Sequence, residues 1–310
     1  MGKIAVIDDI IENMEKVIID KRHEIELTII ALMCRGHVLV EDVPGVGKTS
    51  LASALAKSLD CSFKRIQFTP DIMPSDITGF SVFNPAKGDF EFRQGAILSH
   101  IVLADEINRT SPKTQSSLLE AMEEKQVTVD GTTYKLKEPF MVLATQNPID
   151  YLGTYPLPEA QLDRFFMCIS LGYPSKKEEQ RIVFRFGGKN PLDTLKPVAS
   201  IRHVLALQKA VEKVHVDERV GEYIVNLVRH TRDNEFVTLG ASPRASISLF
   251  KASQAWALYN GRDYVIPDDT VKMTEFVLAH RIILNQEAKL KKISRSDIVK
   301  MALSRIKIPV

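Results

Sequence analysis

The feature that most constrains the fold is a series of short strand-like runs separated by helical patterns. The runs lie at 38–40, 63–68, 101–104, 140–145 and 165–170, and most of them are wholly or largely apolar. Strands that are apolar throughout are buried on both faces, and strands that alternate with helices pair in parallel. We therefore predict an α/β core in which a mostly parallel sheet is covered by helices on both faces.

Two segments interrupt this alternation and read as β-hairpins inserted into the core, at 80–93 and 126–137. Each contains a turn sequence, Pro-Ala-Lys-Gly-Asp in the first and Asp-Gly in the second. After Pro174 the pattern becomes helical. A chain of 310 residues is longer than one compact core usually organises. We therefore predict two domains, the α/β core with its hairpins at 1–173 and an all-α domain at 174–310.

The composition is that of an ordinary globular protein, with a net charge of only +2. This near balance gives no support for a surface that coats nucleic acid or an anionic membrane. The three cysteines lie far apart and form no C-x-x-C pair, so neither a disulfide framework nor a zinc site is expected. The N-terminal sequence resembles neither a signal peptide nor a membrane span. We expect a cytoplasmic protein without membrane insertion.

The stretch LVEDVPGVGKTS, at 39–50, has the order of a phosphate-binding loop: a strand, a turn rich in Pro and Gly, and Lys-Thr at the start of a helix. Gly45 and Gly47 allow several backbone N–H groups to converge on an anion, and the helix adds its positive end. Lys48 would reach the outer phosphates and Thr49 would hold Mg²⁺. The residues expected to bind the nucleotide here are Pro44, Gly45, Val46, Gly47, Lys48, Thr49 and Ser50.

Asp42 departs from the strict pattern G-x-x-x-x-G-K-[ST], because it stands where the first glycine is usual. Aspartate tolerates unusual backbone angles better than most residues, so we expect the loop to form in spite of it. The alternative interpretation is a Gly-rich turn that occurs by chance.

Two further strands end in polar side chains. The run at 101–104 is followed by Asp105 and Glu106, and the run at 140–145 leads to Asn147. Ligands in parallel α/β sheets bind beyond the carboxyl ends of the strands. There Asp105 would hold Mg²⁺, Glu106 would polarise the attacking water, and Asn147 would hold that water or the γ-phosphate. Taken singly, each is also explained as an ordinary strand end that faces solvent.

Two arginines lie at helix ends that the local sequence defines. Arg164 ends a short helix that Pro158 begins. Arg244 lies in the first turn of a helix with Ser242 as N-cap and Pro243 as its first residue. The alternative for each arginine is a surface ion pair.

Together these motifs resemble the MoxR-type AAA+ ATPases. The stretches that carry the resemblance are LVEDVPGVGKT, ADEINRTSPKTQSSLLEAMEE, VLATQNPIDYLGTYPLPEAQLDRF and GASPRA, and they follow the family's order and spacing. The resemblance implies an AAA+ αβα core followed by a helical lid, and hydrolysis of ATP to ADP with Mg²⁺. It also implies a homo-oligomeric ring, commonly a hexamer. The hairpin at 80–93 matches the helix-2 insert of this clade.

The resemblance assigns a role to each candidate residue. The corresponding residues are Lys48 and Thr49 in Walker A, Asp105 and Glu106 in Walker B, Asn147 as sensor 1, Arg164 as the arginine finger and Arg244 as sensor 2 in the lid. An arginine finger acts on the ATP of the neighbouring subunit, whereas Arg244 would belong to the residues that bind the nucleotide. The family itself uses the form EDVPGVGKT, so Asp42 is compatible with a working loop.

The family is associated with chaperone-like remodelling or activation of partner proteins, often partners with a von Willebrand factor A domain. This sequence contains no such domain, so we expect a partner of that kind on a separate polypeptide. One departure is Asp20, where the family often has glycine near the adenine. Two other classes stay open: an ATP-switched assembly scaffold that hydrolyses little, and a nucleic-acid-associated motor, against which the near-neutral charge weighs.

Overall fold

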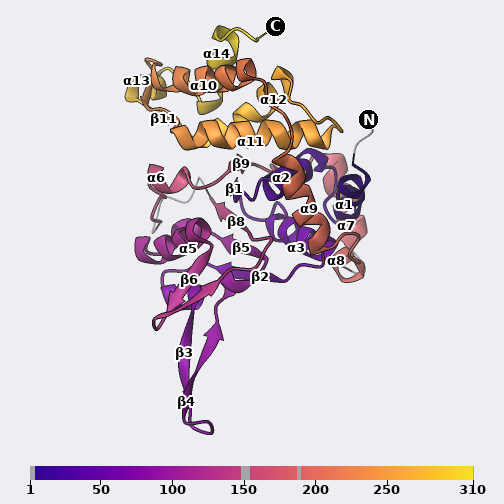
Figure 1. Cartoon of the computed structure of the whole chain (residues 1–310), viewed down its shortest axis with the longest axis vertical. Helices are drawn as coiled ribbons and strands as arrows, with labels where there is room; N and C mark the ends of the chain where they lie inside the picture. The colour runs from indigo at the N-terminus through magenta and orange to yellow at the C-terminus, as the bar shows by residue number, and fades with distance from the viewer. Residues whose placement is uncertain (1–3, 148–153, 187–189, 310) are drawn as a thin grey trace.

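The structure, a computed structural model, describes residues 4–147, 154–186 and 190–309 (Figure 1). The segment 148–153, which contributes the middle of the third motif, lies outside the described residues. The described residues form a core around one sheet and a helical region stacked on one end of that core (Figure 1).

A parallel five-stranded sheet is the centre of the core, with the strand order β2-β5-β8-β1-β9. Its strands are β1 (Val38–Glu41), β2 (Phe63–Gln67), β5 (Ile101–Asp105), β8 (Met141–Gln146) and β9 (Met167–Ile169). All five correspond to runs expected from the sequence, so the prediction of a mostly parallel sheet is confirmed.

The sheet is covered on both faces because the strands inside it are apolar on both faces, whereas the edge strand β2 exposes Lys64, Arg65 and Gln67. Val38 and Val40 belong to one hydrophobic cluster and Leu39, between them, belongs to a second. The helical elements of the core are α1 (Ala5–Glu15), α2 (Arg22–Met33), α3 (Lys48–Ser58), α4 (Pro74–Thr78), η1 (Ala96–Leu98), η2 (Ile107–Arg109), α5 (Pro112–Glu124) and α6 (Glu159–Leu162). The first cluster includes α1, α2 and α3, and the second includes α4 and α5.

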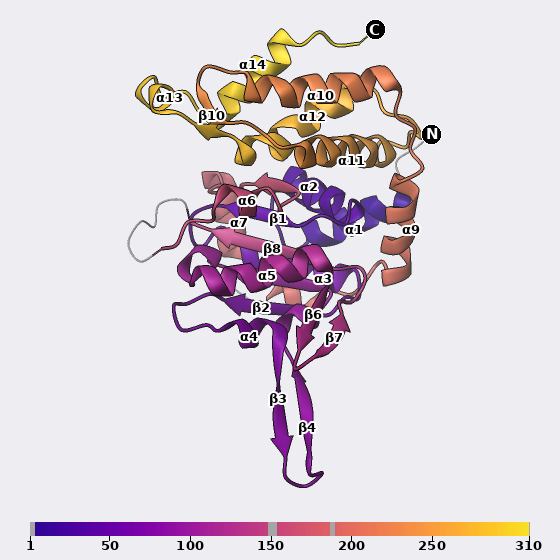
Figure 2. The same ribbon diagram turned by 60° about the vertical axis from the view of Figure 1, so that its left-hand side comes forward.

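Both inserted hairpins are present, as predicted. The first consists of β3 (Gly79–Asn84) and β4 (Asp89–Gln94), and the second of β6 (Gln126–Val129) and β7 (Thr132–Lys135). Figure 2 shows that the first hairpin projects away from the body, on the end opposite the helical region. The ring of Phe92 stacks on Tyr134 with 4.0 Å between centroids, so the two hairpins support each other at their bases.

The region after the sheet is helical, and the prediction of a helical lid is confirmed. Its elements are α7 (Lys176–Phe186), α8 (Pro191–Thr194), α9 (Ile201–Val211), α10 (Glu218–Arg232), α11 (Pro243–Tyr259), α12 (Pro267–Leu278), η3 (Ala279–Arg281), α13 (Gln286–Leu290) and α14 (Arg295–Arg305). The region is not wholly helical, because β10 (Val237–Leu239) and β11 (Ile283–Leu284) form a short antiparallel ribbon. Strands of three and two residues are too short to leave a periodic pattern.

The lid and the core share one hydrophobic cluster. Helix α2 packs against both α9 and α11, and α12 packs against β9. The cluster that begins at Ile7 therefore continues through the sheet to Ala302 in α14. The boundary near residue 173 stays a prediction. Among the described residues, no helix combines the length and apolar character needed to cross a membrane.

Candidate functional site

The predicted loop between β1 and α3 has the backbone that a phosphate cradle requires. Gly45 and Gly47 have φ angles of 86° and 96°, in the region where a side chain would be strained. An added Cβ on either glycine would meet no atom within 4 Å, so the backbone there is open to a ligand. Helix α3 begins directly afterwards at Lys48, which places its positive end at the loop.

Asp42 holds this loop through its side chain and not through an unusual backbone angle. Its φ is not positive, so the sequence-based reason for its tolerance is wrong. One carboxylate oxygen, Oδ2, accepts hydrogen bonds from the backbone N–H groups of Leu171 and Gly172 at 2.6 and 2.7 Å, and from the Ser170 hydroxyl at 3.1 Å. The other oxygen accepts from the Val43 N–H at 2.9 Å. Asp42 therefore ties the loop to the chain that follows β9.

A charged pocket of about 240 Å³ lies between the loop and the neighbouring strands. Its lining residues are Pro44, Gly45, Gly47, Lys48, Thr49, Arg65, Gln67, Asp105 and Glu106. The Lys48 ammonium is largely buried and donates a hydrogen bond to the backbone carbonyl of Asp42 at 2.9 Å. The structure thus brings the predicted loop and the two predicted acids together around one cavity.

Asp105 is a buried carboxylate at the end of β5. The Thr145 hydroxyl donates to its Oδ1 at 2.6 Å, and the Arg65 guanidinium donates to its Oδ2 at 2.7 and 3.2 Å. Arg65 belongs to the site although no motif in the sequence points to it. The pairing of β2 with β5 explains why Arg65 is there. It places Gln67 opposite Asp105, so that β2 ends at the same carboxyl edge of the sheet.

Glu106 follows Asp105 in the left-handed backbone region, with a φ of 58°. Its backbone N–H donates to the Thr145 hydroxyl at 2.9 Å. Its carboxylate accepts from the Gln67 amide at 3.0 Å and from Arg109 at 2.9 Å. A non-glycine residue with positive φ is uncommon and concentrates at functional sites, where surrounding contacts hold it. The contacts from Gln67 and Arg109 fix the direction in which the carboxylate points.

The donor set of this pocket fits a magnesium ion. Mg²⁺ prefers oxygen ligands and is usually held by one or two protein groups together with substrate phosphates and water. Thr49 and Asp105 offer a hydroxyl and a carboxylate within the same cavity. Asn147 directly follows β8, at the edge where Gln146 donates to Glu41 at 2.5 Å. The structure therefore places the predicted Asn147 at the same carboxyl edge.

A second, more apolar pocket of about 220 Å³ lies against the same loop. Its lining residues are Val17, Ile18, Ile19, Lys21, Gly45, Val46, Gly47, Ser50, Gly172, Pro174 and Ile182. Gly45 and Gly47 are common to both pockets. One face of the loop is therefore charged and the other apolar.

Asp20 lies beside this apolar pocket and has a φ of 52°. Glycine adopts such an angle without cost, whereas aspartate is one of the few other residues that tolerate it. Its carboxylate forms an ion pair with Arg181 of α7 at 2.8 Å. The aspartate therefore preserves the backbone conformation and adds a link to the helix that follows the sheet.

Arg164 and Arg244 meet each other at a different place. Both form ion pairs with Glu123 of α5, Arg164 at 3.2 Å and Arg244 at 2.7 Å. They line a separate pocket of about 220 Å³, which we call the arginine pocket, together with Glu123 and His37. His37 precedes β1, so this pocket lies at the amino edge of the sheet.

The sheet separates the two arginines from the charged pocket. Lys48 follows the carboxyl end of β1, and four residues of extended strand span on the order of 10 Å. The structure therefore does not bring Arg244 to the loop of its own subunit, where the sequence-based assignment of nucleotide binding would need it. It brings Arg244 to Arg164, the predicted finger, because Ser242 and Pro243 begin α11 above the amino edge.

Comparison with known proteins identifies the class to which this fold and site belong. A family model described as "ATPase family associated with various cellular activities (AAA)" matches residues 37–167, and a model for an AAA lid domain matches residues 229–301. The parallel sheet, the glycine loop and the helical lid are therefore those of an AAA+ protein.

Full-length relatives define the family more narrowly. Chaperone MoxR1 of Mycobacterium tuberculosis is 38% identical, over 99% of this chain and 84% of its own. Uncharacterized protein YeaC of Bacillus subtilis is 53% identical, over 97% of this chain and 94% of its own. A crystal structure from Cytophaga hutchinsonii, described as a candidate ATPase, is 42% identical with a TM-score of 0.93 and covers 99% of this chain and 96% of its own. The chain belongs to the MoxR family of AAA+ ATPases.

Proposed function

We propose that this protein hydrolyses Mg-ATP in a ring of identical subunits, commonly a hexamer in this family, and that each active site is shared between two neighbours. The observation that carries the proposal is the separation of the site residues. Lys48 and Glu106 lie around the charged pocket, whereas Arg164 and Arg244 meet on Glu123 at the opposite edge of the sheet. A complete site then needs a second subunit.

ATP would lie across the loop, with its phosphates in the charged pocket and its base in the apolar one. Backbone N–H groups of the loop, the Lys48 ammonium and the start of α3 would neutralise the phosphates. Thr49 and Asp105 would hold Mg²⁺, which supplies charge compensation on the phosphates. Gly45 and Gly47 line both pockets, so the two pockets lie on either side of one stretch of backbone. This arrangement supports the placement.

Glu106 would orient and polarise the attacking water, and Asn147 would help to hold that water. The Gln67 amide and Arg109 already restrain the Glu106 carboxylate, which supports a defined direction of attack. The neighbour would present Arg164, and with it Arg244, to the γ-phosphate. A guanidinium in that position stabilises the charge that develops on the transferred group and is worth roughly 10³ to 10⁵ in rate.

We propose chaperone-like remodelling or activation of a protein partner as the purpose of this hydrolysis. The relative named Chaperone MoxR1 supports this role, and a partner with a von Willebrand factor A domain on a separate chain fits the family expectation. The first hairpin supports it as well, because Phe83 and Phe90 near its tip are exposed and available for contact. We propose that the protein acts in the cytoplasm.

Mixing two inactive variants tests the shared site. Glu106→Gln should bind ATP but fail to hydrolyse it in its own site, and Arg164→Ala should fail to activate the neighbour's site. Each variant alone should therefore turn over ATP at less than a tenth of the wild-type rate, a change of about 1.4 kcal/mol or more in the barrier. In a mixed ring, an intact Glu106 can face an intact Arg164, so ATP turnover should partly recover.

The mixture needs a control that separates exchange from chemistry. Subunits labelled with a fluorescent donor or acceptor report whether the two variants enter the same ring. Arg219→Ala, which removes an exposed arginine that pairs with Asp217 two residues before it, serves as the matched arginine variant and should keep wild-type turnover. Exchange without any recovery of turnover would contradict the shared site.

A further inference from the structure

Arg281, in the turn η3 of the lid, is a buried charge to which the proposed function assigns no role. Only 2% of its side chain is exposed. Burial lowers the pKa of its guanidinium to about 10, which leaves it charged at neutral pH. A buried charge is stable only when its donors are matched by partners of good geometry. The identity of those partners is therefore informative.

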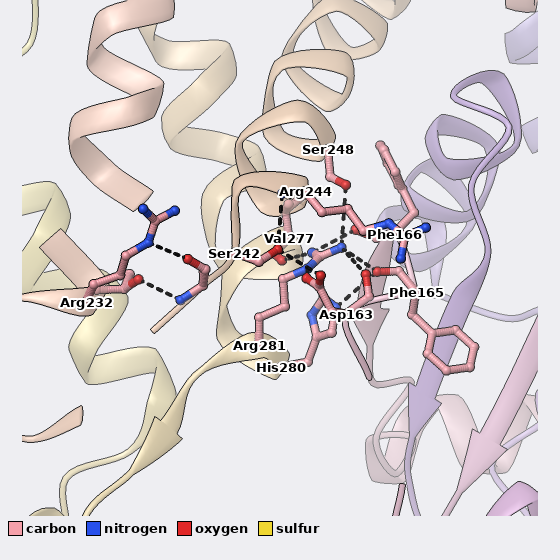
Figure 3. A network of polar contacts seen from close by, with 12 residues as sticks. Asp163, Phe165, Phe166, Arg232, Ser242, Arg244, Ser248, Val277, His280 and Arg281 are labelled. Atoms are coloured by element: carbon pink, nitrogen blue, oxygen red, sulfur yellow. Dashed lines mark hydrogen bonds and ion pairs between the residues drawn. The ribbon is translucent and has the colours of Figure 1, made fainter. Parts of the chain in front are cut away.

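Most of its partners belong to one short segment of the core, 163–166 (Figure 3). The guanidinium Nε donates to the Asp163 carboxylate at 2.8 Å. Its Nη2 donates to the carbonyl oxygens of Phe165 at 2.6 Å and of Asp163 at 3.3 Å, and Nη1 donates to that of Phe166 at 3.3 Å. These contacts hold the backbone on both sides of Arg164.

The remaining partners belong to the lid. Nη1 also donates to the carbonyl of Val277 in α12, and Nη2 reaches the Ser248 hydroxyl in α11 at 3.4 Å. A guanidinium presents five N–H groups in a rigid plane, and here that plane is divided between core and lid. Arg281 therefore fixes the segment 163–166 against two lid helices at once.

Asp163 extends the same network to Arg244. Its second carboxylate oxygen accepts a hydrogen bond from the Ser242 hydroxyl at 2.8 Å. Ser242 is the N-cap of α11, and its hydroxyl accepts from the backbone N–H of Arg244 at 3.1 Å. Figure 3 shows this path from Arg281 through Asp163 to the first turn of α11. Arg164 and Arg244 are therefore both connected to Arg281, which lines the arginine pocket with them.

We infer that Arg281 is a positioning residue, which sets where Arg164 and Arg244 stand relative to the ATP of the neighbouring subunit. This inference rests on the proposed function, because it assumes that the two arginines act across the interface. Arg281 does not touch the nucleotide itself. A shift of about 1 Å in a group that contacts the reacting atoms can lower the rate by about 10²-fold, so a buried clamp on the backbone around Arg164 has a measurable effect.

Arg281→Lys tests this role while keeping the charge. An ammonium is a point charge and cannot span the partners that a planar guanidinium reaches, so the segment 163–166 should lose its fixed position. We expect kcat for ATP to fall by about ten- to a hundredfold. The KM for ATP should change by less than about twofold, because the loop of the same subunit is untouched. Partial unfolding would also lower the apparent kcat and leave the KM unchanged, because it only reduces the active fraction, so kcat is calculated per folded protein as measured by circular dichroism.

Arg262→Lys is the matched control. Arg262 also forms an ion pair within the lid, with the buried Asp269 at 2.5 and 2.7 Å, and is itself partly buried, but its hydrogen bonds do not reach the segment 163–166. It should lower stability in the same way as Arg281→Lys and leave kcat within about twofold of wild type. An equal fall of kcat in both variants would mean that Arg281 is only structural.

Mixed rings locate the defect. If Arg281 acts through Arg164, Arg281→Lys damages the neighbour's site, so mixing it with Glu106→Gln should restore turnover. Mixing it with Arg164→Ala should restore nothing, because both defects lie on the same side of the interface. Recovery with Arg164→Ala, or none with Glu106→Gln, would overturn the positioning role.

The mixture of Arg164→Ala with Glu106→Gln separates the two proposals. If it recovers and the mixture with Arg281→Lys does not, the positioning role alone fails. If neither recovers, the action of Arg164 across the interface fails, and the positioning role fails with it. Should Arg281→Lys not fold, Ser242→Ala removes the link to Asp163, and Ser294→Ala, the N-cap of α14, is its control. Ser242→Ala should lower kcat by severalfold with the same mixing pattern, and an unchanged kcat would overturn the inference.

Discussion

The carboxylate of Asp42 accepts a hydrogen bond from the backbone N–H of Leu171 at 2.6 Å. This contact joins the start of the glycine loop to the chain that leaves the sheet after β9. The same oxygen also accepts a hydrogen bond from the backbone N–H of Gly172, so one carboxylate anchors both the loop and the segment that leads to α7. An aspartate at this position is thus a structural requirement of the fold and does not indicate a degenerate loop.

Replacing Asp42 by the glycine of the strict loop pattern should therefore lower the stability of the protein. Asp42→Gly removes an acceptor of four hydrogen bonds, and bonds to a charged group contribute about 1.5 to 3 kcal/mol each. We expect the free energy of unfolding to fall by at least about 2 kcal/mol in urea titrations. Asp42→Asn keeps one carbonyl acceptor for Leu171 and Gly172 and should lose about half as much. Equal stability of Asp42→Gly and wild type would show that the anchor contributes nothing.

Lys48→Ala should abolish tight ATP binding. The buried ammonium and the loop N–H groups would act on the same phosphates, and a charged contact worth about 3 kcal/mol corresponds to roughly a hundredfold in affinity. Isothermal titration calorimetry with ATP and Mg²⁺ measures this loss. Lys57→Ala, an exposed lysine of the same helix, is the control and should bind as wild type does. Unchanged affinity in Lys48→Ala would exclude this loop as the phosphate site.

The aromatic residues of the first hairpin should divide into two groups. Phe83 and Phe90 are 50% and 66% exposed, whereas Phe92 stacks on Tyr134 and packs on the second hydrophobic cluster. Replacing Phe83 and Phe90 together by Ser should leave the unfolding midpoint and basal ATP turnover unchanged. It should reduce the remodelling or activation of a protein partner. Phe92→Ser should lower the free energy of unfolding by about 1 to 2 kcal/mol. A tip variant that unfolds as readily as Phe92→Ser would contradict this division.

Stability should fall in mild acid because of His37. Its ring accepts from the Val142 N–H at 3.0 Å and contacts the Met122 carbonyl at 3.3 Å, and burial lowers its pKa from 6.5 to about 4. Between pH 6.5 and 4 the unfolded chain binds a proton on His37 that the native state does not bind. The free energy of unfolding should therefore fall by up to about 1.4 kcal/mol per pH unit from pH 6.5 to 4.

Replacing the ring tests this assignment. His37→Gln should lower stability at pH 7.5, because its amide fits the two partners less well, but the slope below pH 6.5 should become shallower. Urea titrations at several pH values supply the comparison, and an unchanged slope in His37→Gln would assign the effect to other groups.

The sequence predicted those parts of the site that follow directly from local order. Each strand of a parallel sheet delivers its next residues to the same edge, so Lys48, Asp105 and Asn147 could be placed together from three separate motifs. Both hairpins were predictable for the same reason, because a turn sequence between two short runs is a local signal.

The parts that the sequence did not predict depend on distant pairs. Asp163 and Arg281 are separated by 118 residues, and no periodicity links them. The position of Arg244 depends on how the lid packs on the core, which the local N-cap pattern does not determine. Arg65 could be assigned only once the register of β2 against β5 was known.

The packing of the lid on α2 also has a consequence for synthesis of the chain. The side-chain amide of Gln208 in α9 donates to the carbonyl of Leu32 at the end of α2, across 176 residues. A ribosome that adds about 5 to 20 residues per second makes the second partner roughly 9 to 35 seconds after the first. During that interval α2 has already been made, but α9 and α11, the helices that pack against it, have not. We therefore expect the N-terminal region to reach its final packing last. General chaperones should bind the nascent chain mainly before the lid helices have been made.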